Sequence, residues 1–501
     1  MNLKRLIYCS CTALLLACGS KKEETVDEVL TPSGLGGKEL AELHCSRCHE
    51  YTPPQMLDKK TWEAGVLPEM GLRLGIGDLF GKLLGMSQEH MNQTIAANIY
   101  PDRPMLAEED WKKIVAYYAE NAPEKPLPQA TKEKISKNLS GFRVISRNIP
   151  EGGLPKNTFV KFSPEEKSVY SGEKNGKLYR YDLKLKKADS LGAFGAVADI
   201  YFEKDGLRIL DMGQIDPHEG KFGKFYQRTA DGTQKILLDT LRRPVRAAFG
   251  DLDEDGVEDM LVCSFGFELG KLAWYSGKNK KENVLKNLPG ARNVFIRDMN
   301  NDGKNDIVAL MTQAREGVFI FYNQGNGRFD EKQVLSFSPV FGSSHIQLVD
   351  FNKDGFVDIV YSNGDNADFS YSFKSYHGLR IFENSGKNSF KEAFFYPVYG
   401  AAESHTADFD QDGDLDIALI SYFPDKNQVP NEGFLFLENT GGYQFKVSSF
   451  PQAKNGIWMT MDVADMDKDG DLDIVLGAYE RGSVNSSRQK LEMVVLENLK
   501  R

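Results

Sequence analysis

The chain has 501 residues, of which 41% are hydrophobic and 27% charged, and its formal net charge is -10 at pH 7. This composition is that of a soluble globular protein, and the length allows two or more domains. The acidic balance argues against a nucleic acid as the partner.

The first residues, MNLKRLIYCSCTALLLACGS, combine two basic residues with a short apolar run that ends at Cys18. The run is too short to span a bilayer as a mature helix and has the layout of a secretory signal. LLAC resembles a bacterial lipobox, which implies a signal peptide over residues 1–17 and a lipid on Cys18; an ordinary signal peptide cut near Ser20 is the alternative. By the same resemblance, Gly19 favours an outer membrane lipoprotein that faces the periplasm or the cell surface. Residues 18–35 are then a tether, and the lipid is the only membrane contact.

The motif CSRCH, from Cys45 to His49, is the attachment signature of c-type haem. Two thiols at this spacing form thioethers with the haem vinyl groups, and the adjacent imidazole ligates the iron. A redox dithiol or half of a zinc site is the alternative for the C-x-x-C part. The export signal, the histidine and the preceding helical segment KELAELH favour covalent haem on Cys45, Cys48 and His49.

Residues 36–123 resemble class I cytochromes c, in which a methionine ligates the iron opposite the histidine. The last predicted helix, EEDWKKIVAYYAENA over residues 108–122, has an apolar face and is expected to pack on the first helix. Met105 directly precedes this helix. Met70 lies in TWEAGVLPEMG, which resembles the distal helix of some short cytochrome domains. Either methionine is expected as the sixth ligand, and another ligand or an open site is the alternative.

Residues 124–140 are rich in proline, lysine and serine and are predicted to form a linker. A glycine followed by a hydrophobic and aromatic strand then recurs. Its first four copies are 47 residues apart and begin at Gly176, Gly223, Gly270 and Gly317. Seven units fill residues 141–501 at roughly 50 residues each, the period of a four-stranded propeller blade. The segment 141–153 is expected to supply the fourth strand of the last blade and so to close the ring.

A nine-residue acidic phrase, D-x-[DN]-x-D-G-x-x-D, occurs five times in this region. Oxygens at positions 1, 3, 5 and 9, with a backbone carbonyl near 7, are ligands that Ca2+ prefers, and the glycine permits a sharp turn. Position 12 lacks the glutamate of an EF-hand, and a short apolar strand follows each phrase, so each loop is expected to join two strands. The predicted ligands, in about five Ca2+ sites, are Asp251, Asp253, Asp255, Asp259, Asp298, Asn300, Asp302, Asp306, Asp350, Asn352, Asp354, Asp358, Asp408, Asp410, Asp412, Asp416, Asp465, Asp467, Asp469 and Asp473.

These phrases resemble the FG-GAP/VCBS repeats of integrin-alpha-type propellers. The expected fold of the whole chain is therefore multidomain: a small all-α cytochrome c-like domain is followed by an all-β seven-bladed propeller. Propellers of this type serve adhesion, polysaccharide binding and enzyme scaffolding, so the resemblance specifies the fold more than the function.

In propellers of this family, the first strand of each blade lines the central channel and runs toward the calcium loop. Residues shortly before each first aspartate are therefore expected on the opposite face, which three long loops also reach. A sugar or an anionic group is expected to bind there through charge-assisted hydrogen bonds, and a packing role is the alternative for each histidine. The candidate residues of this ligand face are Arg246, His345, Asp365, Asp368, His377 and His405.

Three hypotheses for the function follow. The first is a lipid-anchored electron carrier, not an enzyme, whose propeller docks a redox partner protein, a glycan or a surface protein. The second is an oxidoreductase whose propeller oxidises a sugar-type substrate and passes electrons to the chain's own haem. The third is a surface adhesion module. The sequence contains no nucleophile triad, phosphate loop or dinucleotide fingerprint, which favours the carrier.

Overall fold

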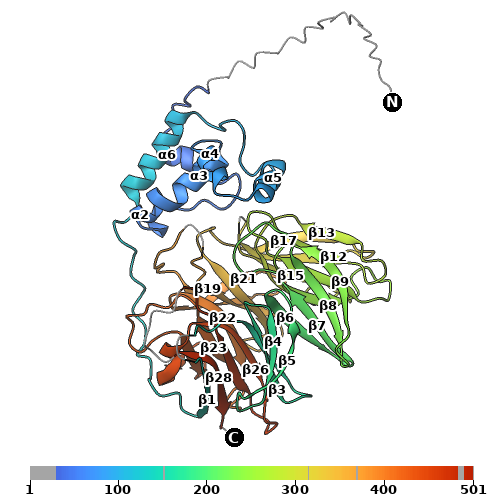
Figure 1. The fold of residues 1–501 in the computed structure, drawn as a ribbon. Coiled ribbons are helices and arrows are strands. Elements are labelled where there is room, and N and C mark those ends of the chain that lie inside the picture. The colour runs from blue at the N-terminus through green and yellow to red at the C-terminus, as the bar shows by residue number, and fades with distance from the viewer. Residues whose placement is uncertain (1–29, 151–152, 314, 368–369, 483–489, 500–501) are drawn as a thin grey trace, which may run out of the picture.

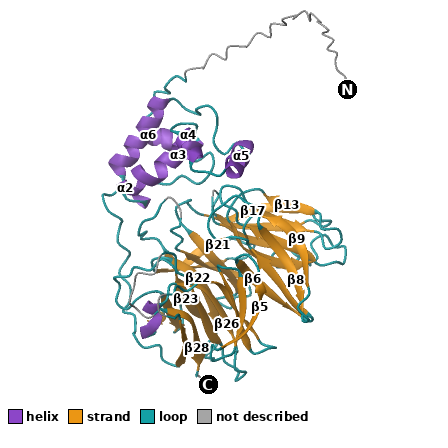
Figure 2. Cartoon of the chain, viewed as in Figure 1, coloured by secondary structure: helices purple, strands orange, loops and turns teal. Residues whose placement is uncertain are grey.

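The computed structural model (Figure 1) describes residues 30–150, 153–313, 315–367, 370–482 and 490–499. The predicted signal peptide, Cys18 and most of the predicted tether lie outside these residues. Within the described ranges, no helix has the length and hydrophobicity that a bilayer crossing requires. A helical region precedes a β-rich region along the chain (Figure 2).

The helical region is held together by contacts between its first and last helices. A Cβ added to Gly37 in the first helix would lie 2.3 Å from the carbonyl oxygen of Lys113 in the last, so only glycine allows this close approach. Trp62 and Tyr118 pack with their ring centroids 4.4 Å apart in the core. The helices are α1 (Gly37–Cys45), a 3-10 turn (Pro54–Met56), α2 (Lys59–Thr61), a π-helical turn (Trp62–Val66), α3 (Leu67–Arg73), α4 (Leu79–Leu84), α5 (Gln88–Ala96) and α6 (Glu108–Asn121).

The β-rich region forms seven four-stranded sheets, which confirms the predicted seven-bladed propeller. The first blade consists of β2 (Asn157–Ser163), β3 (Ser168–Glu173), β4 (Lys177–Tyr181) and β5 (Lys187–Ala193), and the second of β6 (Val197–Glu203), β7 (Gly206–Asp211), β8 (Gly223–Thr229) and β9 (Gln234–Leu241). The third blade consists of β10 (Pro244–Gly250), β11 (Asp259–Ser264), β12 (Lys271–Tyr275) and β13 (Glu282–Lys286). The fourth consists of β14 (Ala291–Ile296), β15 (Ile307–Met311), β16 (Gly317–Asn323) and β17 (Phe329–Ser336). The next two are β18 (Ser343–Val349), β19 (Asp358–Asn363), β20 (Gly378–Asn384) and β21 (Phe390–Pro397); β22 (Ala401–Ala407), β23 (Asp416–Ser421), β24 (Phe434–Asn439) and β25 (Phe445–Ser448). The last blade combines β26 (Trp458–Ala464), β27 (Asp473–Ala478) and β28 (Leu491–Asn498) with β1 (Phe142–Asn148), and a 3-10 turn (Pro451–Asn455) precedes it.

The second strand of a blade is covered on both sides by neighbouring blades. Every residue of β11, β19, β23 and β27 is buried. Outer strands such as β17, with the sequence FDEKQVLS, are largely exposed. This difference explains why the segments after the acidic loops are almost continuously apolar, because a strand buried on both faces needs no polar side.

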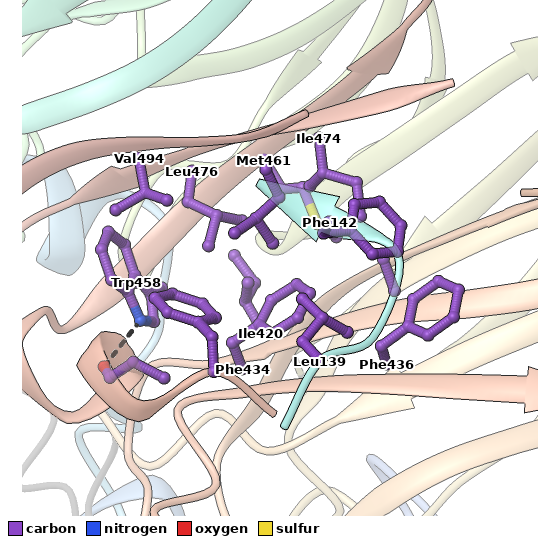
Figure 3. Close-up of a cluster of buried hydrophobic side chains, with 14 of the residues drawn as sticks. Leu139, Phe142, Ile420, Phe434, Phe436, Trp458, Met461, Ile474, Leu476 and Val494 are labelled. Carbon is purple, nitrogen blue, oxygen red and sulfur yellow. Dashed lines mark hydrogen bonds between the residues drawn. The ribbon is translucent and has the colours of Figure 1, made fainter. Parts of the chain in front are cut away.

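Strand β1 closes the ring, as the sequence predicts. It pairs antiparallel with β28 from Phe142 opposite Asn498 to Asn148 opposite Leu491. Figure 3 shows that the side chain of Phe142 enters a buried cluster built by the last two blades, where its ring lies 5.2 Å from that of Phe436. Other members of the cluster shown there are Leu139, Ile420, Phe434, Trp458, Met461, Ile474, Leu476 and Val494. The earliest and latest parts of the propeller sequence therefore share one core.

The predicted linker, residues 124–140, packs along the propeller. Ile135 and Leu139 are buried in the cores of blades. The backbone N–H of Ser136 donates to the carbonyl of Val447 at 2.9 Å. Because the apolar side chains of this segment are spaced apart by polar ones, its composition alone does not reveal that it is anchored.

Candidate functional site

The predicted haem-attachment residues lie at the end of α1 and in the turn that follows. Cys45 is half-buried, Cys48 is exposed, and both are free thiols. The Nδ1 atom of His49 lies 2.9 Å from the carbonyl oxygen of Glu50, and burial lowers the pKa of this histidine. A neutral imidazole that donates from Nδ1 keeps the lone pair of Nε2 for a metal. This set of donors fits a c-type haem.

The two candidate methionine ligands have different surroundings. Met70 lies in α3 and is half-buried. Met105 is 43% exposed, and its backbone N–H donates to the carbonyl of Leu74 at 2.9 Å. A methionine thioether packs best against apolar groups, so the partial burial of Met70 favours Met70 over Met105 as the candidate sixth ligand. Ligation by either residue stays a prediction.

Each of the five acidic loops joins the first strand of a blade to the second, as predicted. The glycine at position 6 has a left-handed φ in every loop, from 82° at Gly256 to 99° at Gly470, which glycine adopts without strain. Its N–H donates to the aspartate at position 1, for example from Gly256 to Asp251 at 2.9 Å. In the loops that begin at Asp251, Asp408 and Asp465, carboxylate oxygens from positions 1, 3 and 5 lie within 4.8 Å of one another.

The aspartate at position 9 has a structural role that the pattern does not indicate. It is buried in every loop, and both of its carboxylate oxygens accept backbone N–H groups. Asp259, for example, accepts from Leu252 at 2.8 Å and from Gly277 at 2.9 Å, which ties the loop to the end of the third strand. A carboxylate oxygen keeps a further lone pair, so Ca2+ ligation at position 9 stays a prediction.

The loop that begins at Asp465 contains a buried carboxylate that the predicted ligand set missed. Asp471, at position 7, is 3% exposed, and neither of its carboxylate oxygens has a hydrogen-bond donor. Burial and the nearby carboxylates of Asp469 and Asp473 raise its pKa to about 7. A bound cation would neutralise these charges, so the loop fits Ca2+. The aspartate after the glycine in DMDKDGDLD is the sequence signal that identifies it.

Three residues of the predicted ligand face lie on inner strands. Arg246 lies on β10, His345 on β18 and His405 on β22. The guanidinium of Arg246 pairs with the carboxylate of Asp199 at 2.8 Å. The two histidines converge on Glu403, with His405 Nε2 at 3.2 Å and His345 Nε2 at 3.9 Å from Glu403 Oε1. The inner strands therefore bring charged groups from several blades together.

The other three residues of the predicted ligand face belong to the loop between β19 and β20. Asp365 lies 3.6 Å from the guanidinium of Arg292. Asp368 lies outside the described residues. His377 is fully buried, and neither of its ring nitrogens has a hydrogen-bond partner. The structure thus places His377 inside the protein, next to the propeller face on which it was expected.

Acid is expected to destabilise the propeller in part through His377. Burial, with Lys374 and Arg380 nearby, holds the pKa of this histidine well below 6.5. As the pH falls below 6.5, the unfolded chain binds a proton that the folded chain does not, which costs up to about 1.4 kcal/mol per pH unit. We expect His377→Met to show a smaller fall in melting temperature than the wild type between neutral pH and about pH 5. Parallel pH profiles for the two proteins would contradict this role.

The helical region docks on one face of the propeller (Figure 1). The propeller residues in contact lie at the end of β17, in loops that join blades or in loops that join second and third strands, so this face is opposite the acidic loops. Val340 and Tyr376 of the propeller share one apolar cluster with Trp62 and Tyr118 of the helical region. Side-chain hydrogen bonds across this interface include Glu50 with Ser336 at 2.8 Å, Thr52 with Ser338 at 2.8 Å and Asp58 with Ser372 at 2.7 Å.

A buried carboxylate of the propeller anchors the other side of the helical region. Glu268, in the loop between β11 and β12, accepts a hydrogen bond from Tyr100. Arg73 and His90 lie 3.6 Å and 3.5 Å from the same carboxylate. No sequence pattern indicates this residue, because its partner Tyr100 is 168 positions away along the chain.

Replacing Glu268 by alanine is expected to loosen the helical region. The change leaves a buried tyrosine hydroxyl and two basic groups without their partner, which typically costs about 2–5 kcal/mol. Hydrogen exchange should then increase in residues around Tyr100 and α5, without an increase in the blades. Asp216→Ala is the control. Asp216 forms an ion pair with Lys174 at 2.6 Å within the propeller, and its side chain is 57% exposed. Unchanged exchange around Tyr100 would show that Glu268 does not hold the interface.

Comparison with known proteins identifies an FG-GAP-like repeat at residues 298–361. This segment contains two of the acidic loops. The chain is also similar to cartilage acidic protein 1 of Mus musculus, with 29% identity over 265 residues, 50% of this chain and 38% of the mouse protein. With the Homo sapiens protein of the same name it shares 29% identity over 174 residues, 32% of this chain and 24% of the human protein. The matches thus span less than half of either curated relative.

Comparison with solved structures finds propeller domains at TM-scores below 0.5. The WD40 domain of Neurospora crassa Pan2 superimposes with a TM-score of 0.41 and 12% identity, covering 68% of this chain and 88% of that domain. The WD40 β-propeller domain of Doa1 gives a TM-score of 0.44 and 11% identity, covering 71% of this chain and 96% of that domain.

Proposed function

We propose that the chain is a lipid-anchored c-type cytochrome that transfers electrons, with a calcium-binding propeller as its docking module. The observation that supports this proposal most is the placement of the helical region. The region with CSRCH is fixed on the propeller face opposite the acidic loops, where Glu50 and Thr52, just after the motif, hydrogen-bond to the propeller. A partner that binds this face therefore meets the helical region as well.

The residues that would hold the haem are Cys45 and Cys48, through thioether bonds, and His49, through Nε2. The haem supplies a one-electron redox couple when it is bound. The hydrogen bond from His49 Nδ1 to the carbonyl of Glu50 orients the imidazole. Glu50 also accepts a hydrogen bond from Ser336 of the propeller at 2.8 Å, so the propeller supports the residue that orients the iron ligand.

The haem proposal is tested by expressing the chain together with a cytochrome c maturation system. We expect covalent haem that survives denaturation, and a low-spin c-type spectrum after reduction with dithionite. The double variant Cys45→Ala/Cys48→Ala should lose all covalent haem. Cys263→Ala is the matched control, because Cys263 is a buried free thiol in β11 and should leave the haem in place. Absence of covalent haem from the wild type would remove the electron-transfer proposal.

The sixth ligand is tested with Met70→Ala and Met105→Ala. Loss of an axial methionine lowers the reduction potential and changes the spectrum. We expect this change in Met70→Ala and little change in Met105→Ala. The opposite result would assign Met105, and no change in either variant would indicate a different ligand or an open site.

The carrier and oxidoreductase hypotheses differ in what reduces the haem. A carrier should be reduced only by dithionite or by a partner enzyme. An oxidoreductase should be reduced by a sugar-type substrate alone. The charged residues on the inner strands, such as Arg246 and Glu403, are the candidate substrate-binding residues for this alternative. We propose the carrier, and substrate-dependent reduction of the purified protein would replace it with the enzyme. Labelling with a radioactive fatty acid, lost in Cys18→Ser, tests the lipid anchor.

A further inference from the structure

We propose that His345, Glu403 and His405 bind one divalent transition-metal ion in the channel of the propeller. Each of the three residues offers one ligand atom, and these atoms all lie within 4.8 Å of one another. His405 Nε2 is 3.2 Å and His345 Nε2 is 3.9 Å from Glu403 Oε1. The two imidazole rings are nearly parallel, with a centroid distance of 5.7 Å and an angle of 27°. Small side-chain rotations would bring all three donors to metal-bond distances of about 2.0–2.2 Å.

The propeller fold places these residues together from two neighbouring blades. The pairing register shifts between Ser343 and His345 in β18 and, in the same way, between Ala401 and Glu403 in β22. His345 and Glu403 therefore occupy equivalent positions on neighbouring inner strands. His405 follows Glu403 by two residues and so points to the same side of its strand. The donors are built into strands and not into mobile loops, as a preorganised site requires.

Two of the three donors are in the chemical state that a metal requires. His345 is 8% exposed, and its Nδ1 has no hydrogen-bond partner. Burial lowers its pKa to about 3, so the ring is neutral at pH 7. Burial raises the pKa of Glu403, but the hydrogen bond and charge of His405 bring it down to about 2. His345 and Glu403 thus offer a neutral imidazole and an ionised carboxylate, whereas a metal ion replaces the hydrogen on His405 Nε2 that faces Glu403.

Glu403 is also held in position from a third blade. Its second carboxylate oxygen accepts the backbone N–H of Met461 at 3.1 Å. A carboxylate whose one oxygen is fixed by the backbone presents the other in a defined direction. The side chains of Glu403 and His405 remain 14% and 25% exposed, so the site keeps some contact with solvent.

The charges around the site are compatible with a cation. Two guanidinium groups, those of Arg246 and Arg292, lie close enough to act on His345. That of Arg246 is paired with Asp199 at 2.8 Å, and that of Arg292 lies 3.6 Å from Asp365. The ammonium of Lys161 lies 3.0 Å from the carboxylate of Asp199. Asp462, on β26, adds a further carboxyl group near His405. Arg246 and Lys161 are thus engaged by Asp199 and Arg292 by Asp365, while the carboxylate of Glu403 lies beside both histidines.

The donor set selects the class of metal. Two imidazoles and one carboxylate suit Zn2+, Fe2+, Co2+, Ni2+ or Cu2+, whereas Ca2+ and Mg2+ prefer an all-oxygen shell. The proposed site is therefore distinct in chemistry from the acidic loops, which lie at the opposite ends of the inner strands. Three protein ligands also leave a position open for water or a small substrate.

The test measures zinc binding by the full-length protein in the presence of excess Ca2+, which fills the acidic loops. Equilibrium dialysis followed by elemental analysis gives the zinc bound per chain. We expect the wild type to bind about one zinc more than His345→Ala, Glu403→Gln and His405→Ala, whose affinity should fall by more than about 10-fold. Glu403→Gln retains an acceptor for the N–H of Met461, so it separates loss of the ligand from loss of the fold.

His218→Ala is the matched control, because this histidine is half-buried in the loop between β7 and β8 and is not one of the three proposed ligands. It should bind zinc as the wild type does. Zinc should also raise the melting temperature of the wild type and of His218→Ala, and not that of His405→Ala. Equal zinc binding in wild type and all three site variants would overturn the proposal, whether or not the haem is present, because CSRCH contributes equally to each protein.

Discussion

Removal of calcium is expected to lower the melting temperature of the propeller by more than about 10 °C. An ion that binds only the folded state contributes about 2.7 kcal/mol at 100 times its dissociation constant, and five loops contribute together. For a large domain, each kcal/mol corresponds to roughly 2–4 °C. The measurement is thermal unfolding with EGTA and after calcium is restored. Unchanged unfolding with the chelator would show that the acidic loops are not calcium sites.

Asp471→Asn provides a second test of calcium binding, because its effect on the stability of the propeller should have opposite signs with and without calcium. Without calcium, the buried carboxylate of Asp471 is repelled by Asp469 and Asp473, which with burial raise its pKa to about 7. The amide relieves this repulsion, so the variant should be more stable than the wild type in EGTA. With calcium, the variant loses an attractive charge next to the ion and should be less stable. An effect of one sign in both buffers would contradict a cation at this loop.

Opening of the ring at β1 is expected to be the most damaging single change in the propeller core. Phe142 packs edge-on against Phe436 at 5.2 Å and Phe409 at 6.4 Å, and Figure 3 shows it within the cluster of the last two blades. Phe142→Ala should cost about 3–5 kcal/mol, because it removes a buried ring and leaves a cavity. Denaturant unfolding gives the loss of stability, and hydrogen exchange should show that β28 opens first.

Arg143→Ala is the control on the same strand. Its side chain is 61% exposed and forms an ion pair with Glu497 on the neighbouring strand β28. An exposed ion pair of this kind contributes about 0–1 kcal/mol to the free energy of unfolding. Comparable, small losses in both variants would mean that β1 does not hold the ring closed.

The blades were predictable because their signals are local. The acidic phrase needs a tight turn, and the glycine at position 6 has the left-handed φ that this turn requires. The apolar segment after each phrase is a strand buried on both sides. The closing strand could be predicted as well, because the seventh unit lacks its fourth strand and residues 141–153 supply it. The turn and strand inferences use residues that are neighbours in the sequence, whereas the closing strand follows from the number of strands in each repeat.

The candidate sites were predictable only in part. The sequence indicated His345 and His405 as members of one face, but their convergence on Glu403 depends on how β18 packs against β22 of the neighbouring blade. Asp365 and His377 come from the same loop, yet Asp365 pairs with Arg292 and His377 is fully buried. Burial is set by how blades and loops pack on each other, which the local pattern does not contain.

By itself, the sequence determined the seven blades, the five acidic loops, the closing strand and a helical region whose last helix packs on its first. Tertiary structure alone decided that this region docks opposite the acidic loops, where Tyr100 donates a hydrogen bond to Glu268. It also decided that Ile135 is buried in the propeller and anchors the linker. The physical reason is the range of the interactions. Turns, strands and helices follow from neighbouring residues, whereas an interface forms between groups that only the closed propeller brings together.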